Sequence, residues 1–143
     1  MAEDLAIVGG IMTAWGKGEF EPGPNFEALF NKYFNPDSEI VRDGDNGDAA
    51  FIRTYTGHQG FALWLKLLAS CTPLVFEPQM SSAAPGLVLM TINAKFQNKI
   101  TGSTYASQVC VTWSIKDGKC VQHRFFGFST EMWRCFNSHL SKY

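Results

Sequence analysis

The candidate proton-transfer residues of the sequence are one aspartate and two histidines: Asp43, His58 and His123. A carboxylate or an imidazole acts as a general base when its surroundings bring its pKa towards the working pH. Each residue also has a structural explanation. Asp43 begins a polar turn over residues 43–48, His58 stands at the expected start of a helix, and a strand histidine such as His123 is often hydrogen-bonded in a core or an interface. Both explanations stay open at this point.

The sequence lacks the motifs of metal, nucleophile and phosphate chemistry. Its four cysteines have no CxxC pair and no histidine at metal-ligand spacing, and no GxSxG, P-loop or HExxH pattern occurs. The cysteines are expected to be small buried hydrophobic residues of a reduced protein, at positions Cys71, Cys110, Cys120 and Cys135. We therefore expect no metal and no cofactor, and we expect any catalysis to proceed by proton transfer.

Periodicity predicts the elements that must position these residues. Apolar residues recur at helical intervals over 5–15, 26–34 and 57–69, which predicts three helices. We expect Pro36 to stop the second helix and Pro73 to end the third, because proline cannot continue a helix.

The rest of the chain favours strands. Asp117 and Gly118 predict a tight hairpin between the last two of them, and a short closing helix is expected from Glu131 to His139. Two helices, two short strands, a helix and a long antiparallel meander predict one α+β domain over residues 1–143, with helices enclosing a cavity against a cone-shaped, curved sheet. The expected strands cover 38–42, 51–55, 74–80, 87–97, 105–115 and 120–128.

Composition limits the partners. Hydrophobic residues make up 45% of the 143 residues and charged residues 17%, against about 25% charged residues in an average soluble domain. We therefore expect part of the surface to be covered by a second copy, in a homodimer formed through the outer face of the sheet. Twelve Lys and Arg balance 13 Asp and Glu without a basic run, so neither nucleic acid nor a membrane is expected as a partner. The acidic start of the chain has no features of a secretion signal, which predicts a cytoplasmic protein.

The order of elements and the residues at their junctions resemble the nuclear transport factor 2-like superfamily, which includes ketosteroid isomerases and SnoaL-like polyketide cyclases. The residues that carry the resemblance are 26–44, 55–61 and 117–121. The resemblance spans nearly the whole chain. It implies a curved sheet whose concave face, closed by helices, makes a deep cavity, often in a homodimer.

The resemblance also implies roles for particular positions. Asp43, just after the first strand, looks like the general-base aspartate of ketosteroid isomerases, and an apolar cavity would raise its pKa. Those isomerases have two hydrogen-bond donors that stabilise the enolate. At approximately the same positions this sequence has Ile11 and Cys110. Steroid isomerisation by that mechanism is therefore not expected.

In cyclase-like members an aspartate often lies near the end of the last strand, at the position of Phe128 in this sequence. Counting back by two from this residue places one set of side chains on a single face, which we take to be the concave one. His123 then lies on the other face, and an error of one residue would exchange the two sets. The side chains predicted to contact a ligand from this strand are Gln122, Arg124, Phe126 and Phe128.

Three of the candidate residues have both a ligand-binding and a structural explanation. Tyr55 can offer a ligand its hydroxyl and Trp64 its indole N–H, but core packing explains both equally well. An Arg124 inside the cavity would need a carboxylate or an anionic ligand, and the alternative is a position at the rim or in a dimer interface.

These observations predict a module that binds a small, mostly apolar molecule without a cofactor. One alternative is a proton-transfer isomerase, cyclase or dehydratase acting on a polyketide-, steroid- or terpenoid-like substrate, with Asp43, His58 or His123 as its base. The second alternative is a protein-interaction module that binds through an exposed aromatic patch.

Overall fold

Residues 2–21, 23–44, 54–128 and 130–136 are described by the structure, which is a computed structural model. Backbone alone is described for Asp43, Gly44, Gly127, Phe128, Thr130 and Trp133. The predicted residues Asp45 to Asp48 of the polar turn, and the end of the expected closing helix, lie outside the described residues.

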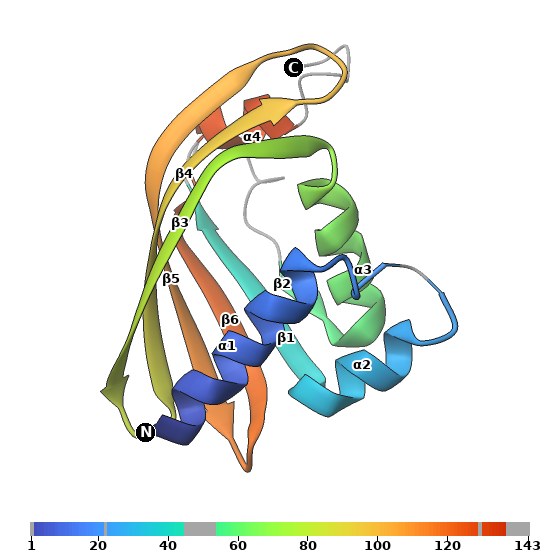
Figure 1. Cartoon of the computed structure of the whole chain (residues 1–143), viewed down its shortest axis with the longest axis vertical. Helices are drawn as coiled ribbons and strands as arrows, with labels where there is room; N and C mark the ends of the chain where they lie inside the picture. Colours follow the sequence, from blue (N-terminus) through green and yellow to red (C-terminus); the bar gives the residue numbers. More distant parts are fainter. Residues whose placement is uncertain (1, 22, 45–53, 129, 137–143) are drawn as a thin grey trace.

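Four helices are present within the described residues. They are α1 (Ala2–Gly16), α2 (Phe26–Tyr33), α3 (Gly57–Leu68) and α4 (Thr130–Phe136). Helix α1 lies across the concave side of the sheet against β3 and β4, while α3 packs against β1 and β2 (Figure 1). Helix α4 contacts β4 and β5. None of the helices in the described part of the chain is long and apolar enough to cross a membrane.

The strands form one six-stranded mixed sheet in the order β2-β1-β6-β5-β4-β3. Strand β1 runs parallel to β6, and the other neighbours are antiparallel. The sheet curls strongly along β3, β4 and β5, and the helices lie on its concave side (Figure 1). The predicted α+β class and curved mixed sheet are therefore confirmed. The strands are β1 (Phe34–Gly44), β2 (Thr54–Thr56), β3 (Cys71–Ala84), β4 (Leu87–Asn98), β5 (Thr104–Lys116) and β6 (Lys119–Phe128).

Helices α2 and α3 end before Pro36 and Pro73, as predicted, but the prolines themselves lie in strands and do not directly follow the helices. Helix α2 ends at Tyr33, and Pro36 already lies in β1; helix α3 ends at Leu68, and Pro73 lies in β3. Pro36 falls where the pairing of β1 with β6 is irregular, and Pro73 is in an edge strand beside a register shift. A proline is tolerated at both kinds of place because no ladder hydrogen bond has to be donated there.

The hairpin between β5 and β6 forms as predicted. Asp117 and Gly118 both adopt positive φ angles, of 53° and 78°, which a two-residue turn of this twist requires. The inward side chains of β5 then alternate as expected along the strand: Val109, Val111 and Trp113 are buried, with Tyr105 packed against the same core.

Strand β6 contains two irregularities that change the direction of its side chains. Its pairing with β5 passes from Ser114–Gln122 directly to Ile115–Cys120, so β6 has an extra residue at this point. Its pairing with β1 passes from Arg42–Phe125 to Gly44–Phe128, which again leaves one extra residue in β6. Each bulge moves the residues beyond it to the opposite face of the sheet.

Asn98, at the end of β4, holds α4 in place. This side chain is 1% exposed, and its amide nitrogen donates to the carbonyl oxygens of Cys135 at 3.1 Å and Phe136 at 3.4 Å. Its amide oxygen accepts the backbone N–H groups of Ile100 at 3.0 Å and Thr101 at 3.2 Å. One side chain thereby joins the end of α4 to the turn between β4 and β5.

Candidate functional site

A cavity of about 1130 Å³ lies between the concave face of the sheet and the helices. Its sheet wall comes from inward residues of β3 to β6, and its helical wall comes from α1 and α3, with Met132 of α4 at one end. Ligand pockets in proteins commonly have volumes of about 300 to 1000 Å³. The cavity is therefore large enough for a molecule of several fused rings.

The walls are almost entirely apolar, and aromatic rings form much of them. Aromatic lining residues come from helices and sheet alike: Trp15, Phe20, Phe26, Phe61, Trp64, Phe76, Phe96, Trp113 and Phe125. Alternation explains the sheet residues, because every second side chain of β4 and β5 points to the concave face.

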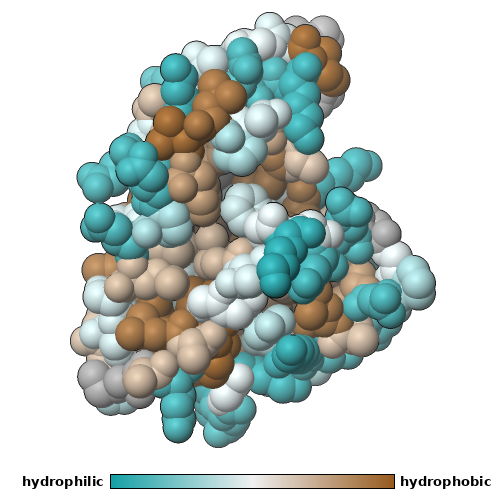
Figure 2. Space-filling view, in the orientation of Figure 1, coloured by the Kyte–Doolittle hydropathy of each residue, from teal (hydrophilic) through white to brown (hydrophobic). Residues whose placement is uncertain are grey.

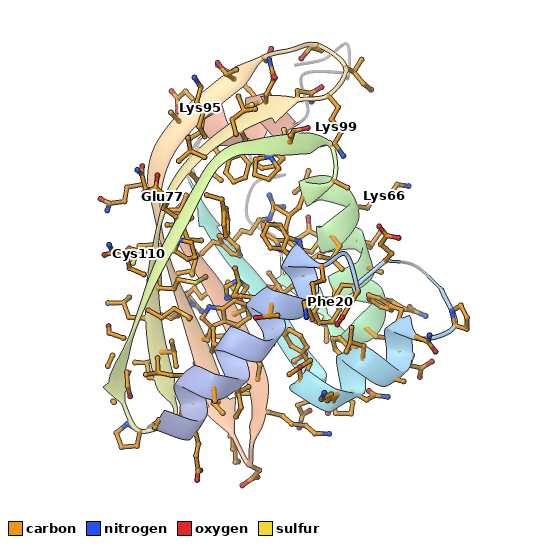
Figure 3. The ribbon with its side chains drawn as sticks, viewed as in Figure 1. Phe20, Lys66, Glu77, Lys95, Lys99 and Cys110 are labelled. Carbon is orange, nitrogen blue, oxygen red and sulfur yellow. The ribbon has the colours of Figure 1, made fainter. Side chains whose placement is uncertain are left out.

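The mouth of the cavity lies between α3 and the segment that follows α1. The exposed lining residues come mainly from these two places: Gln59, Leu63 and Lys66 on α3, and Gly16, Gly18 and Glu21 at and after the end of α1, with Ala69 and Pro73 after α3. Lys66 projects away from α3 on the outside of the molecule, whereas Phe20 points in among the helices (Figure 3). On this face of the molecule polar side chains surround patches of apolar ones (Figure 2). The charged lining groups thus lie at the entrance.

His123 lines the inner wall of the cavity and is 5% exposed. Its ring stacks on Trp113, with 3.5 Å between centroids and 18° between planes, and Phe125 packs edge-on at 4.6 Å. Its Nδ1 lies 3.1 Å from the carbonyl oxygen of Thr112. Burial lowers the pKa of His123 from 6.5 to about 3, although the hydrogen bond to Thr112 opposes this. The imidazole is therefore neutral at physiological pH.

A row of aromatic contacts leads from His123 to a buried arginine. Phe125 packs on Trp64 at 4.8 Å, and Trp64 packs on Tyr55 at 5.7 Å. The guanidinium of Arg42, which is fully buried, lies 5.5 Å from the Trp64 ring and donates a 2.9 Å hydrogen bond to the Tyr55 hydroxyl. Cation–π contact and this hydrogen bond offset part of the cost of burying the charge.

The prediction for the faces of β6 was wrong. His123 and Phe125 line the cavity, whereas Gln122, Arg124 and Phe126 do not. Phe126 is 42% exposed and packs with Arg124 on the convex side, 6.0 Å from its guanidinium carbon to the ring centroid. Counting by two from Phe128 crosses the bulge between Phe125 and Phe128, and this exchanges the two faces.

The remaining predicted residues fall into three groups. Trp64 lines the cavity as expected. Tyr55 and His58 do not line it: Tyr55 is bound to Arg42, and His58 at the start of α3 lies 6.2 Å from the ring of Phe30. For Asp43 and Phe128 the side chains lie outside the described residues. The backbone of Asp43 belongs to β1, which continues beyond the expected strand 38–42, so Asp43 lies in the strand and not just after it.

The two positions compared with isomerase donors also differ from each other. Ile11 lines the cavity, as the resemblance implied. Cys110 does not line the cavity, because its neighbours Val109 and Val111 are the buried, inward residues of β5, and Cys110 projects from the other side of the sheet (Figure 3). A donor at Cys110 would not reach a bound molecule.

Several site residues were missed by the sequence analysis, and a signal for some of them was present. Ser38, Ile40 and Arg42 alternate as buried residues of β1, so the inward direction of Arg42 could have been predicted from its spacing. Cys71 lines the cavity, but burial raises the pKa of its thiol to about 12, which makes it a poor nucleophile. Among the described residues no three His, Cys, Asp or Glu side chains come together in a group that could hold a metal ion.

No family model and no curated protein matches the sequence. Solved structures match it instead. An NTF2-like protein from Burkholderia xenovorans LB400 is 19% identical, with a TM-score of 0.76 over 96% of this chain and 98% of its own.

Two further solved structures are similar to the chain. IdmH from Streptomyces antibioticus, a candidate polyketide cyclase, is 18% identical, with a TM-score of 0.59 over 86% of this chain and 90% of its own. TerC, crystallised with polyporic acid, is 15% identical, with a TM-score of 0.65 over 87% of this chain and 91% of its own. The chain has the NTF2-like fold, and its function has to be argued from its own cavity.

Proposed function

We propose that this NTF2-like fold serves to bind one small, mostly apolar molecule in its cavity, without a cofactor. The observation that carries the proposal is the cavity of about 1130 Å³ with apolar and aromatic walls and its charged groups at the mouth. Removing a hydrophobic molecule from water into such a space is favourable, by about 25 cal/mol for each Å² of apolar surface buried. An open cavity also argues against a module that uses only its outer surface.

A fluorescent dye tests the proposal. N-phenyl-1-naphthylamine is uncharged and emits strongly only in apolar surroundings, and Trp15, Trp64 and Trp113 of the cavity wall can transfer energy to it. We expect saturable binding of the dye with loss of tryptophan emission.

Two matched replacements of alanine by tryptophan test whether the dye binds in the cavity. Ala94 on β4 points into the cavity and is 3% exposed, whereas Ala106 on β5 is exposed and does not line it. Ala94→Trp places an indole inside the cavity and should weaken dye binding, while Ala106→Trp should leave it unchanged. Equal binding by both folded variants would exclude the cavity as the site.

A proton-transfer enzyme is the second candidate, favoured by the presence of an imidazole inside the cavity. At neutral pH the imidazole of His123 is a weak base, because the pKa of its conjugate acid is about 3. This alternative therefore rests mainly on Asp43. In a turnover assay with polyketide-like or terpenoid-like substrates, Asp43→Asn should lower the rate about a hundredfold to ten-thousandfold while leaving binding intact. An unchanged rate would exclude Asp43 as the base.

A further inference from the structure

The polar groups of the cavity wall are few, and their positions restrict the ligand. Glu21, Gln59 and Lys66 are exposed and lie at the mouth. Deeper in the cavity, the imidazole of His123 is the only nitrogen acceptor among the described lining residues. A charged ligand group placed at this depth would have no oppositely charged partner in the described wall, which is strongly unfavourable. The buried part of the ligand is therefore expected to be uncharged.

The hydrogen bond to Thr112 fixes which nitrogen of His123 carries the proton. A carbonyl oxygen can only accept, so Nδ1 at 3.1 Å must be the donor. In a neutral imidazole the other nitrogen, Nε2, then has a lone pair and no hydrogen. Among the described residues nothing donates to Nε2, and Nε2 is not one of the fully buried polar atoms without a partner, so it remains accessible on a residue that lines the cavity. Nε2 of His123 is therefore an acceptor in the wall of a cavity that offers a water molecule few other hydrogen bonds.

Stacking holds this acceptor in a fixed orientation. Trp113 covers one face of the imidazole at 3.5 Å, and Phe125 packs against it at 67°. The ring cannot turn without breaking both the stack and the bond to Thr112, so the direction of the Nε2 lone pair is set by the fold. An acceptor in a fixed direction selects a ligand with a donor at one position.

We infer that the ligand is an uncharged, hydroxylated polycyclic molecule whose O–H donates a hydrogen bond to Nε2 of His123. This inference rests on the proposed function. The aromatic walls suit flat rings, and a phenolic hydroxyl is a stronger donor than an aliphatic one, which matches a weakly basic acceptor. An ether or a hydrocarbon of the same shape would leave Nε2 without a partner.

Three probes of nearly equal shape test the inference. They are 1-hydroxypyrene, 1-methoxypyrene and pyrene, which all accept energy from tryptophan, and their dissociation constants are measured at pH 6.5. We expect the hydroxylated probe to bind about three- to tenfold more tightly than the methoxy probe. Equal affinity of wild-type protein for the three probes would overturn the inference while leaving the proposed function in place. If none of them binds, both fail.

Two variants on β6 assign the preference to His123. His123→Phe keeps an aromatic ring against Trp113 but has no acceptor, so the preference for the hydroxyl should disappear. Phe125→Leu changes the next inward residue of the same strand and retains the imidazole. It should weaken all three probes alike and preserve their ratio. A preference that survives in His123→Phe would also overturn the inference, and the comparison of probes on wild-type protein does not depend on either variant folding.

Discussion

The neutrality of His123 is set by its position in the fold. In water an imidazole binds a proton near pH 6.5, but in the wall of the cavity burial lowers the pKa of His123 to about 3. Between these two values the unfolded chain binds a proton that the folded protein does not. Stability from this residue is therefore fully present above pH 6.5 and is lost as the pH falls towards 3.

Acid stability should consequently depend on this one side chain. Each pH unit in that window lowers the free energy of unfolding by about 1.4 kcal/mol through His123. The test is to measure the free energy of unfolding by urea denaturation at pH 7.5 and at pH 4.5. Between these two pH values we expect it to fall by about 2 to 3 kcal/mol less in His123→Phe than in wild type. Val109→Ala, another change in the cavity wall, keeps the histidine. Its free energy of unfolding should fall on acidification by as much as that of wild type. Equal losses in wild type and His123→Phe would contradict this account.

At the scale of single elements, we expect Asn98 to contribute more to stability than asparagine, a residue type found mostly on protein surfaces, usually does. Its side chain makes four hydrogen bonds that join α4 to the turn after β4. Removing it leaves buried carbonyl and N–H groups without partners, so Asn98→Ala should lower the free energy of unfolding by about 2 to 4 kcal/mol. Asn93→Ala, at an exposed position of the same strand, should change it by less than about 0.5 kcal/mol. Similar melting temperatures for the two variants would contradict the role of Asn98.

Strands β5 and β6 are expected to be the slowest part of the sheet to exchange amide hydrogens. They are the two central strands of the sheet, whereas β2 and β3 are its edge strands. Interior strands exchange only near the global free energy of unfolding. In a hydrogen-exchange experiment read by mass spectrometry, peptides from 108–126 should be protected longest. Rapid exchange throughout that range would contradict the assigned sheet order.

The sequence predicted the elements well where one period holds along a whole segment. The inward alternation of β5 is an example, because Val109, Val111 and Trp113 follow each other without a bulge. It failed in β6, where two bulges reverse the alternation and no residue type marks them. It also did not place Pro36 and Pro73 in strands, because whether a proline enters a strand at an irregular or edge position depends on neighbours that are far away in sequence. The role of Asn98 was not predictable for the same reason.

At the scale of the whole molecule, the convex face of the sheet is the surface on which a second copy is expected. On β5 the central side chains of this face are small and uncharged, because the large apolar residues of this strand are confined to the concave face. Its central residues include Thr91, Cys110, Thr112, Ser114 and Gln122, and Arg124 and Phe126 of β6 lie beside Thr112 and Cys110. Small side chains on β5 allow a second sheet to approach closely.

Light scattering at micromolar concentration should therefore give the mass of a dimer, with about 800 Å² buried on each partner if the interface is of ordinary size. Thr112→Arg places a second positive charge beside Arg124 at the centre of this face and should give a monomer. Thr104→Arg places the same charge at the exposed end of β5 and should leave the mass unchanged. A monomeric wild-type protein would contradict the expected dimer, and the apolar residues would then serve the cavity alone.

The pairing of β1 with β6 also fixes when the cavity can exist during synthesis. Ile40 of β1 lies beside His123 of β6, and the two strands are the first and last of the sheet in chain order. When the residues up to the hairpin at Asp117 have emerged from the ribosome, α1, α3 and four long strands are outside it, but the wall with the imidazole is not. The apolar faces of these helices and strands cannot be fully buried before β6 joins the sheet. Folding therefore depends on contacts between distant parts of the chain and is expected to be slow. Until β6 emerges, the nascent chain exposes an apolar surface that chaperones can bind, and a ligand added to stalled chains would find no site.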